Sequence, residues 1–171
     1  MKSEKLQKIR FFPLAVAVLI PLFTGMFSSF LTGEDMKIYQ NMNHPPLAPP
    51  GWVFPVAWTI LYVLMGIASY LVWSSETEIE RKRTALRFYA AQLIMNFFWS
   101  TLFFTYARIL LALVWLLAMW VLVLICAIRF YRIRHAAGWM MGVLLLWTTF
   151  AAYLNFACYA MSITPMPIAR Y

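Results

Sequence analysis

Residues 110–128 read LLALVWLLAMWVLVLICAI, a stretch without charge and without polar side chains other than tryptophan and cysteine. At a rise of about 1.5 Å per residue, a helix of about 20 residues crosses the ~30 Å hydrocarbon core of a bilayer. The other structure that can span a membrane, a closed β-barrel, needs strands of alternating apolar and polar residues. This stretch does not alternate, so we predict a membrane-spanning helix.

Four more stretches without Asp, Glu, Lys or Arg are long enough to span a membrane, at residues 11–33, 38–75, 88–107 and 135–169. Charged residues make up only 12% of the chain, against about 25% in soluble domains. We therefore predict an all-α membrane protein, a five-transmembrane-helix bundle that forms a single domain over residues 1–171. The expected spans are residues 11–32, 52–74, 87–106, 109–128 and 139–162.

The net charge of +8 lies mostly on one side of this bundle. Five spans place the N-terminus, the second loop and the fourth loop on the same side, with eleven basic residues against three on the other. The eleven are Lys2, Lys5, Lys8, Arg10, Arg81, Lys82, Arg83, Arg87, Arg129, Arg132 and Arg134, and the three are Lys37, Arg108 and Arg170. By the positive-inside rule, the N-terminus is cytoplasmic and the C-terminus lies outside the plasma membrane. This asymmetry explains the basic excess without a nucleic-acid partner.

The loop at residues 33–51 is rich in proline, with Pro45, Pro46, Pro49 and Pro50 close together. Prolines lack a backbone donor and favour a stiff, extended path, so a rigid linker is one interpretation. The loop is also longer than a simple turn requires and carries apolar residues, including Tyr39. This favours a lid folded over the bundle.

Three of the spans carry aromatic and polar residues spaced three or four apart, so that each set shares one helix face. The sets are Trp58, Tyr62, Met65 and Ser69; Gln92, Asn96, Trp99 and Phe103; and Trp147, Ala151, Asn155 and Cys158. One interpretation is that Asn96 and Asn155 form hydrogen bonds that hold the helices together. The predicted topology, however, brings all three faces to the outer half of the bundle, below the lid. Aromatic walls, two amides and the small Ala151 then predict a pocket for a flat, apolar ligand.

The remaining tryptophans and the cysteines predict no further site. Trp52, Trp73 and Trp139 fall at span ends, where tryptophan is common at the membrane interface. Trp115 and Trp120 have no polar companion in their span and are predicted to pack or to face lipid. Cys126 and Cys158 lack the spacing of metal ligands and lie at different depths, so we expect neither a metal site nor a disulfide.

These motifs resemble those of the TspO/MBR family, whose members are also called tryptophan-rich sensory proteins, translocator proteins or peripheral benzodiazepine receptors. The resemblance covers about residues 38–160. It rests on Tyr39, His44-Pro45, Pro49-Pro50-Gly51-Trp52-Val53-Phe54, Trp58-Thr59-Ile60-Leu61-Tyr62, Met65-Gly66, Gln92, Asn96, Trp99, Phe103-Phe104, Ala107-Arg108, Trp147, Phe150-Ala151 and Leu154-Asn155-Phe156.

The resemblance implies a five-helix bundle, commonly a homodimer, that binds porphyrins, haem-like tetrapyrroles or isoquinoline and benzodiazepine drugs. No obligatory cofactor is implied. The family pocket would fall on Tyr39, Trp58, Tyr62, Asn96, Trp99, Trp147, Ala151 and Asn155. In some bacterial relatives, the tryptophan that matches Trp58 is implicated in light- and oxygen-dependent tetrapyrrole breakdown.

The sequence departs from the family pattern at several positions. His44 and Leu47 stand where the family pattern has a lysine and a tryptophan in this loop. Trp115 lies near the position at which many family members have an aspartate. The pattern associated with sterol binding needs a tyrosine followed closely by a basic residue. Here Phe156 takes the tyrosine position and no basic residue follows until Arg170, so the sterol pattern is broken.

The leading functional interpretation is a receptor or sensor for tetrapyrrole-like ligands, and two alternatives stay open. A transporter of such ligands is one, although no expected span carries an ionisable group in its interior for an ion-coupled cycle. A porphyrin-degrading enzyme is the other. Without a nucleophile–base pair, its chemistry would depend on ligand photochemistry and on Trp58 as the reactive residue.

The charge asymmetry leads to a test of the topology. A reporter fused after Tyr171 should be found outside the cell, and one fused before Met1 inside, because five spans separate the two termini. The measurement is the activity of a compartment-specific reporter such as alkaline phosphatase. Two cytoplasmic termini would require an even number of spans and contradict this architecture.

Overall fold

The computed structural model describes residues 10–32, 45, 47–105 and 108–163. These residues form five long α-helices and a short π-helix and contain no strand, which confirms the all-α class. The elements are α1 (Phe11–Thr32), α3 (Val53–Trp73), α4 (Ile79–Ser100), the π-helix η2 (Thr101–Thr105), α5 (Ile109–Ile133) and α6 (His135–Ile163). Among them, α1, α3, α5 and α6 are long and apolar enough to cross a membrane.

Helix α4 differs from the other four because its first turns are charged and its apolar part continues into η2. It begins at Ile79, eight residues before the expected span at 87–106. Glu78–Arg81 and Glu80–Arg83 ion pairs of 3.4 and 2.7 Å follow the three-residue spacing that supports a helix in water. The charge-free stretch therefore predicted only the apolar part of α4, and the helix begins earlier, in the charged residues before it. For the same reason α5 ends at Ile133 rather than 128, and α6 begins at His135 rather than 139.

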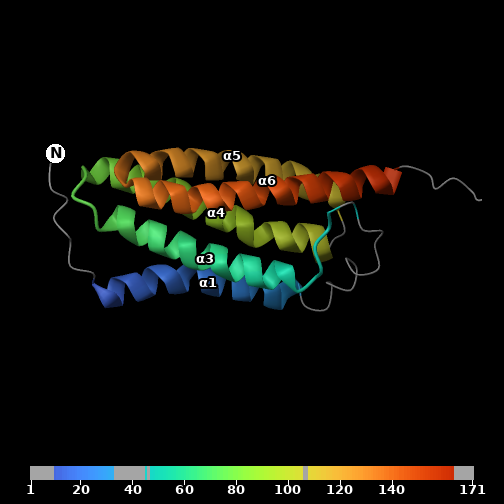
Figure 1. The fold of residues 1–171 in the computed structure, drawn as a ribbon, viewed down its shortest axis with the longest axis horizontal. Coiled ribbons are helices and arrows are strands. Elements are labelled where there is room, and N and C mark those ends of the chain that lie inside the picture. Colours follow the sequence, from blue (N-terminus) through green and yellow to red (C-terminus); the bar gives the residue numbers. More distant parts are fainter. Residues whose placement is uncertain (1–9, 33–44, 46, 106–107, 164–171) are drawn as a thin grey trace, which may run out of the picture.

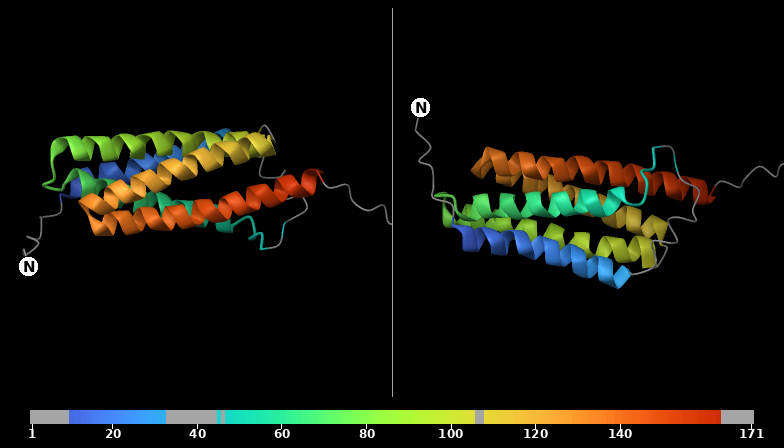
Figure 2. Two further views of the ribbon diagram at one scale, coloured as in Figure 1. Left: turned by 90° about the horizontal axis from the view of Figure 1, so that it is seen from above. Right: turned by 60° about the horizontal axis from the view of Figure 1, so that its bottom comes forward.

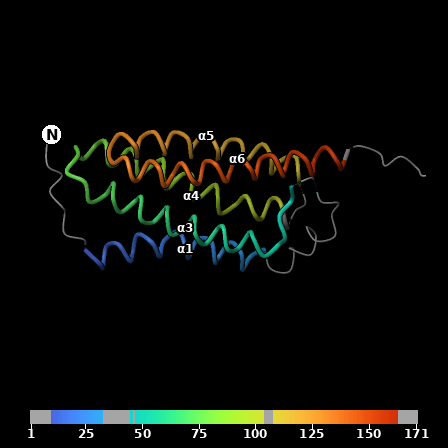
Figure 3. Tube along the Cα trace, in the orientation of Figure 1, coloured from blue at the N-terminus to red at the C-terminus, as the bar shows by residue number. Residues whose placement is uncertain are grey.

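The five long helices lie side by side along the bundle (Figure 1), and their contacts close a ring. Going around the ring, α1 contacts α3, α3 contacts α6, α6 contacts α5, α5 contacts α4, and α4 returns to α1. The two further views and the tube trace show the helices aligned along the long axis (Figures 2 and 3). The free thiols of Cys126 on α5 and Cys158 on α6 are both buried.

Helices α1 and α3 approach each other closely at Gly66. A Cβ atom added there would lie 2.4 Å from the Cα of Val18 and 2.7 Å from the carbonyl oxygen of Ala17. Residue 21 of α1 is proline, so it cannot donate the usual helical hydrogen bond to that carbonyl. The absence of a side chain at Gly66 therefore allows the α3 backbone to lie against the α1 backbone.

The two tryptophans of α5, for which the sequence predicts packing or lipid contact, also form hydrogen bonds to neighbouring helices. The Trp115 Nε1 donates to the backbone oxygen of Met95 on α4 at 2.8 Å. The Trp120 Nε1 donates to the Thr149 hydroxyl on α6, also at 2.8 Å. Sequence spacing along α5 could not reveal these bonds, because both partners belong to other helices.

The tryptophans expected at the membrane interface are exposed at or near helix ends, as predicted. Trp52 precedes α3, Trp73 ends it, and Trp139 lies in the first turns of α6. Their exposed fractions are 68%, 49% and 71%.

Part of the proline-rich loop lies within the described residues. Pro45 is buried and accepts a hydrogen bond from the backbone of Ala48 at 3.0 Å. Ala48 in turn packs against the hydrophobic core, so this part of the loop lies on the bundle. Tyr39 and the remainder of the expected lid fall outside the described residues.

The α1–α3 contact can be tested with two glycine substitutions. Gly66→Ala should lower the free energy of unfolding by about 1–3 kcal/mol, because its methyl group would overlap the α1 backbone. Gly142→Ala is the matched control, since a Cβ there meets nothing within 4 Å. It should be neutral or stabilise α6 by about 0.5–1 kcal/mol. Unfolding in detergent, followed by circular dichroism, measures both, and equal stability of the two variants would contradict the close contact.

Candidate functional site

A cavity of about 580 Å³ lies between α1, α3 and α4, at the end of the bundle where α3 begins. It is lined by Leu22, Gly25, Met26, Ser28, Ser29, Phe30, Thr32, Phe54, Pro55, Trp58, Thr59, Tyr62, Asn96, Trp99 and Ser100. The size is within the range of about 300–1,000 Å³ that is usual for small-molecule pockets.

Trp58 is the centre of an aromatic cluster in the cavity wall. Its ring centroid lies 5.6 Å from that of Tyr62, in a stacked arrangement, and 6.4 Å from that of Trp99. On its other side, Trp58 meets Trp147 of α6 edge-on at 6.5 Å. Trp99 stacks on Phe103 of η2 at 5.5 Å. These aromatic contacts hold the rings in place, so the wall has a defined shape before any ligand arrives.

Asn96 provides a hydrogen-bonding group on the same wall. The Tyr62 hydroxyl donates to the Asn96 Oδ1 at 3.1 Å, which joins α3 to α4. The Asn96 side chain is only 3% exposed, and its Nδ2 has no hydrogen-bond partner among the described residues. A buried amide nitrogen without an acceptor is unusual in proteins. Asn96 therefore contributes to the bundle through its oxygen, and in the described part of the chain its buried nitrogen is an unused donor on a side chain that lines the cavity.

The opposite wall is formed by α1, where small and hydroxyl-bearing residues alternate with bulky apolar ones. A Cβ atom at Gly25 would lie 2.1 Å from the Tyr62 ring, so the missing side chain makes room for that ring. One turn further, the Ser28 hydroxyl donates to the Phe97 carbonyl at 2.8 Å and also contacts the Ser100 hydroxyl. The α1 side of the cavity thus has no side chain at Gly25, and it contributes hydroxyl groups to the lining.

The cavity borders the outside of the bundle between α1 and α3. Met26 and Phe30 of α1, which line it, are 65% and 79% exposed. Pro55 and Thr59 line it from α3 and are also exposed. No lining residue is a carboxylic acid, a histidine or a basic residue. The described site can therefore stack and hydrogen-bond a flat ring system, but it offers no acid–base pair.

The sequence also matches a known protein family. The family model described as TspO/MBR family matches residues 17–161. The chain belongs to the TspO/MBR family. Together with four helices that are apolar enough to span a bilayer, this membership makes the protein a multi-pass membrane protein.

Relatives of this TspO/MBR chain occur in bacteria, archaea and animals. A tryptophan-rich sensory protein of Cereibacter sphaeroides is 41% identical over 69% of this chain and 72% of its own length. A tryptophan-rich protein TspO of Archaeoglobus fulgidus is 33% identical over 87% of this chain and 96% of its own. The translocator protein of Homo sapiens is 32% identical over 75% of this chain and 77% of its own.

The predicted site residues of this TspO/MBR protein divide into four groups. Trp58, Tyr62, Asn96 and Trp99 line the cavity. Phe103 and Trp147 adjoin it through the ring contacts described above. Ala151 and Asn155 are buried on α6 and do not line it, and Tyr39 falls outside the described residues. The role of each residue in ligand binding stays a prediction.

The contribution of α1 was not predicted from the sequence. The described cavity has Gly25 of α1 in its wall, whereas the hollow expected beside Ala151 stays a prediction. A signal was present: Gly25, Ser28, Ser29 and Thr32 are small or hydroxyl-bearing and share one helix face by their spacing. In a span that otherwise reads as uniformly apolar, these residues mark the side that faces other helices.

The contact between Gly25 and Tyr62 can be tested by a double-mutant cycle. Gly25→Ala should lower the free energy of unfolding by about 1–3 kcal/mol, because the methyl group forces the Tyr62 ring to move. In a Tyr62→Ala background the same change should have an effect near zero, since the ring is no longer there. Thermal unfolding of the four proteins in detergent gives the coupling. The same loss in both backgrounds would show that the methyl group acts elsewhere.

Proposed function

We propose that this protein is a membrane receptor or sensor that binds porphyrin- or haem-like tetrapyrroles, or related flat apolar ligands, in the cavity between α1, α3 and α4. The observation that carries the proposal is the Asn96 amide, which lines the cavity beside the aromatic wall and whose Nδ2 has no partner among the described residues. A flat conjugated ligand would lie against Trp58 and Trp99, and a carbonyl or carboxylate at its edge would accept the hydrogen bond from Asn96.

The exposed cavity border between α1 and α3 supports entry from the bilayer. An apolar tetrapyrrole partitions into the hydrocarbon, so a cavity that borders lipid receives it at a high local concentration. The hydroxyl groups of Ser28 and Thr32 give the far wall a polar character that suits the polar substituents of such a ligand.

We also infer that α4 and η2 together form a fifth span. In the closed ring, α4 lies between α1 and α5, both of which are apolar enough to cross the membrane. Residues 88–107, which cover the second half of α4 and η2, carry no charge. A segment held between two spans has the same depth as its neighbours, which supports five crossings and termini on opposite sides.

The function can be tested by comparing two amide-to-leucine substitutions on α4. Asn96→Leu should weaken protoporphyrin binding by up to about tenfold, because one hydrogen bond contributes about 0.5–1.5 kcal/mol. Gln92→Leu is the matched control, since Gln92 is fully buried one turn away and does not line the cavity. Quenching of tryptophan fluorescence in a porphyrin titration measures both affinities.

Two results would count against the proposal. If Asn96→Leu destabilises the bundle and leaves the porphyrin affinity unchanged, Asn96 serves only to join α3 and α4. If both variants lose affinity equally, the effect comes from the packing of α4 and not from a contact with the ligand.

A further inference from the structure

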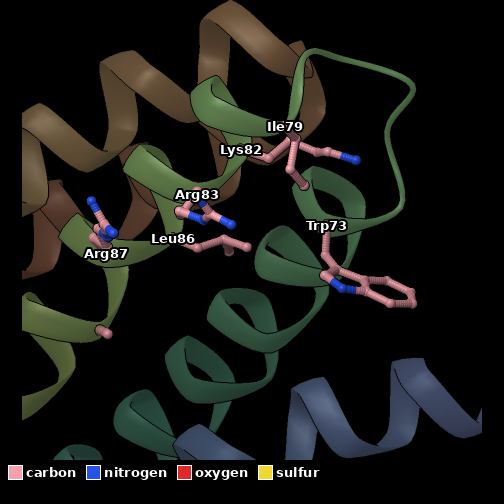
Figure 4. A pocket seen from close by; sticks show the side chains of 7 residues that line it. Trp73, Ile79, Lys82, Arg83, Leu86 and Arg87 are labelled. Carbon is pink, nitrogen blue, oxygen red and sulfur yellow. The ribbon is translucent and has the colours of Figure 1, made fainter.

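A second cavity, of about 410 Å³, lies at the opposite end of the bundle, where α3 ends and α4 begins. Its lining residues are Trp73, Ile79, Lys82, Arg83, Leu86, Arg87 and Ala90 (Figure 4). None of them lines the aromatic cavity, so neither the site described above nor its proposed ligand accounts for this cavity.

The basic residues of this cavity are only weakly neutralised by the protein. The Lys82 ammonium donates one hydrogen bond, to the Ser75 carbonyl at 3.0 Å, and an ammonium has three donors. Arg83 pairs with Glu80 at 2.7 Å, but both side chains are more than half exposed, and such pairs contribute little. Arg87 has no acidic partner in the described part of the chain. The cavity therefore keeps an excess of positive charge.

The apolar residues of the cavity continue from these charges toward the spans. Trp73 is the last residue of α3, and its indole lies at the edge of the cavity (Figure 4). Leu86 points from α4 toward the α3 side, and Ala90 follows one turn deeper along α4. The cavity is thus charged at the end of the bundle and apolar toward its middle. A phospholipid has the same order, with a charged headgroup followed by apolar acyl chains.

We propose that this cavity is a binding site for one anionic phospholipid. The lipid phosphate would lie among Lys82, Arg83 and Arg87, and the start of an acyl chain would run along Trp73, Leu86 and Ala90. Basic cavities beside membrane spans suit acidic headgroups, and an interfacial tryptophan suits the level of the headgroup. A soluble anion would use only the basic half of the cavity. A phospholipid uses both halves and is already present at this depth.

Native mass spectrometry of the full-length protein, with phosphatidylglycerol and phosphatidylcholine of identical acyl chains, tests the proposal. Wild type should retain phosphatidylglycerol in preference to phosphatidylcholine. Each basic residue near an anionic lipid contributes about fivefold in affinity, so Arg83→Gln with Arg87→Gln should weaken phosphatidylglycerol binding by about 25-fold. Arg81→Gln is the matched control, because Arg81 carries the same charge on the same helix and does not line the cavity. Its phosphatidylglycerol affinity should stay within about twofold of wild type.

Three outcomes would overturn the proposal: equal retention of the two lipids, an equal loss of affinity in Arg81→Gln and in the double variant, or displacement of the lipid by millimolar glycerol phosphate. The last of these would indicate a site for free phosphate groups. Circular dichroism and protoporphyrin binding should both be unchanged in the double variant. These two readouts separate loss of the lipid site from unfolding and from any failure of the proposed ligand site.

Discussion

At Gly66 the backbones of α1 and α3 lie so close that α3 could not carry a residue larger than glycine at the contact. This contact determines how far apart the two helices are, and Gly25, two turns along α1, determines how the Tyr62 ring lies between them. With the ring in that position, the Tyr62 hydroxyl reaches Asn96 on α4. The cavity lies beside this arrangement, between the face of α1 that carries Gly25 and the aromatic residues of α3 and α4.

Most polar side chains inside the bundle have a partner in the protein. Ser28 uses a backbone carbonyl of α4, and Trp115 and Trp120 use groups of neighbouring helices. Such bonds satisfy polar groups that would otherwise be costly in an apolar surrounding. Among the described residues, the buried amides of Gln92 and Asn155 and the Asn96 nitrogen have no hydrogen-bond partner. Of these three side chains, Asn96 is the one that lines the cavity.

The two ends of the bundle differ in the interactions that they offer. The end where α3 begins has stacked aromatic rings, one amide and hydroxyl groups, and its lining carries no formal charge. The end where α3 stops has Lys82, Arg83 and Arg87 beside an interfacial tryptophan. Dispersion and stacking select a ligand by the shape of its ring system, whereas exposed charge selects it by sign and acts at longer range. Binding at one end can therefore be changed by substitutions that leave the other end intact.

The sequence by itself determined the helical class and the location of the apolar segments, because a long charge-free stretch has few alternatives to a membrane-spanning helix. It also indicated Trp58, Tyr62, Asn96 and Trp99, since helical periodicity shows which residues share a face. Periodicity does not show which other helix that face meets. Only the tertiary structure decided that α1 forms the opposite wall of the cavity, that Trp115 and Trp120 bond to other helices, and that Ala151 and Asn155 lie outside the wall. The physical reason is that the rotation of a helix, and the helices that it contacts, depend on close backbone contacts such as the one at Gly66. Such contacts form at glycine, which has no side chain and therefore gives no signal in the pattern of apolar and polar residues.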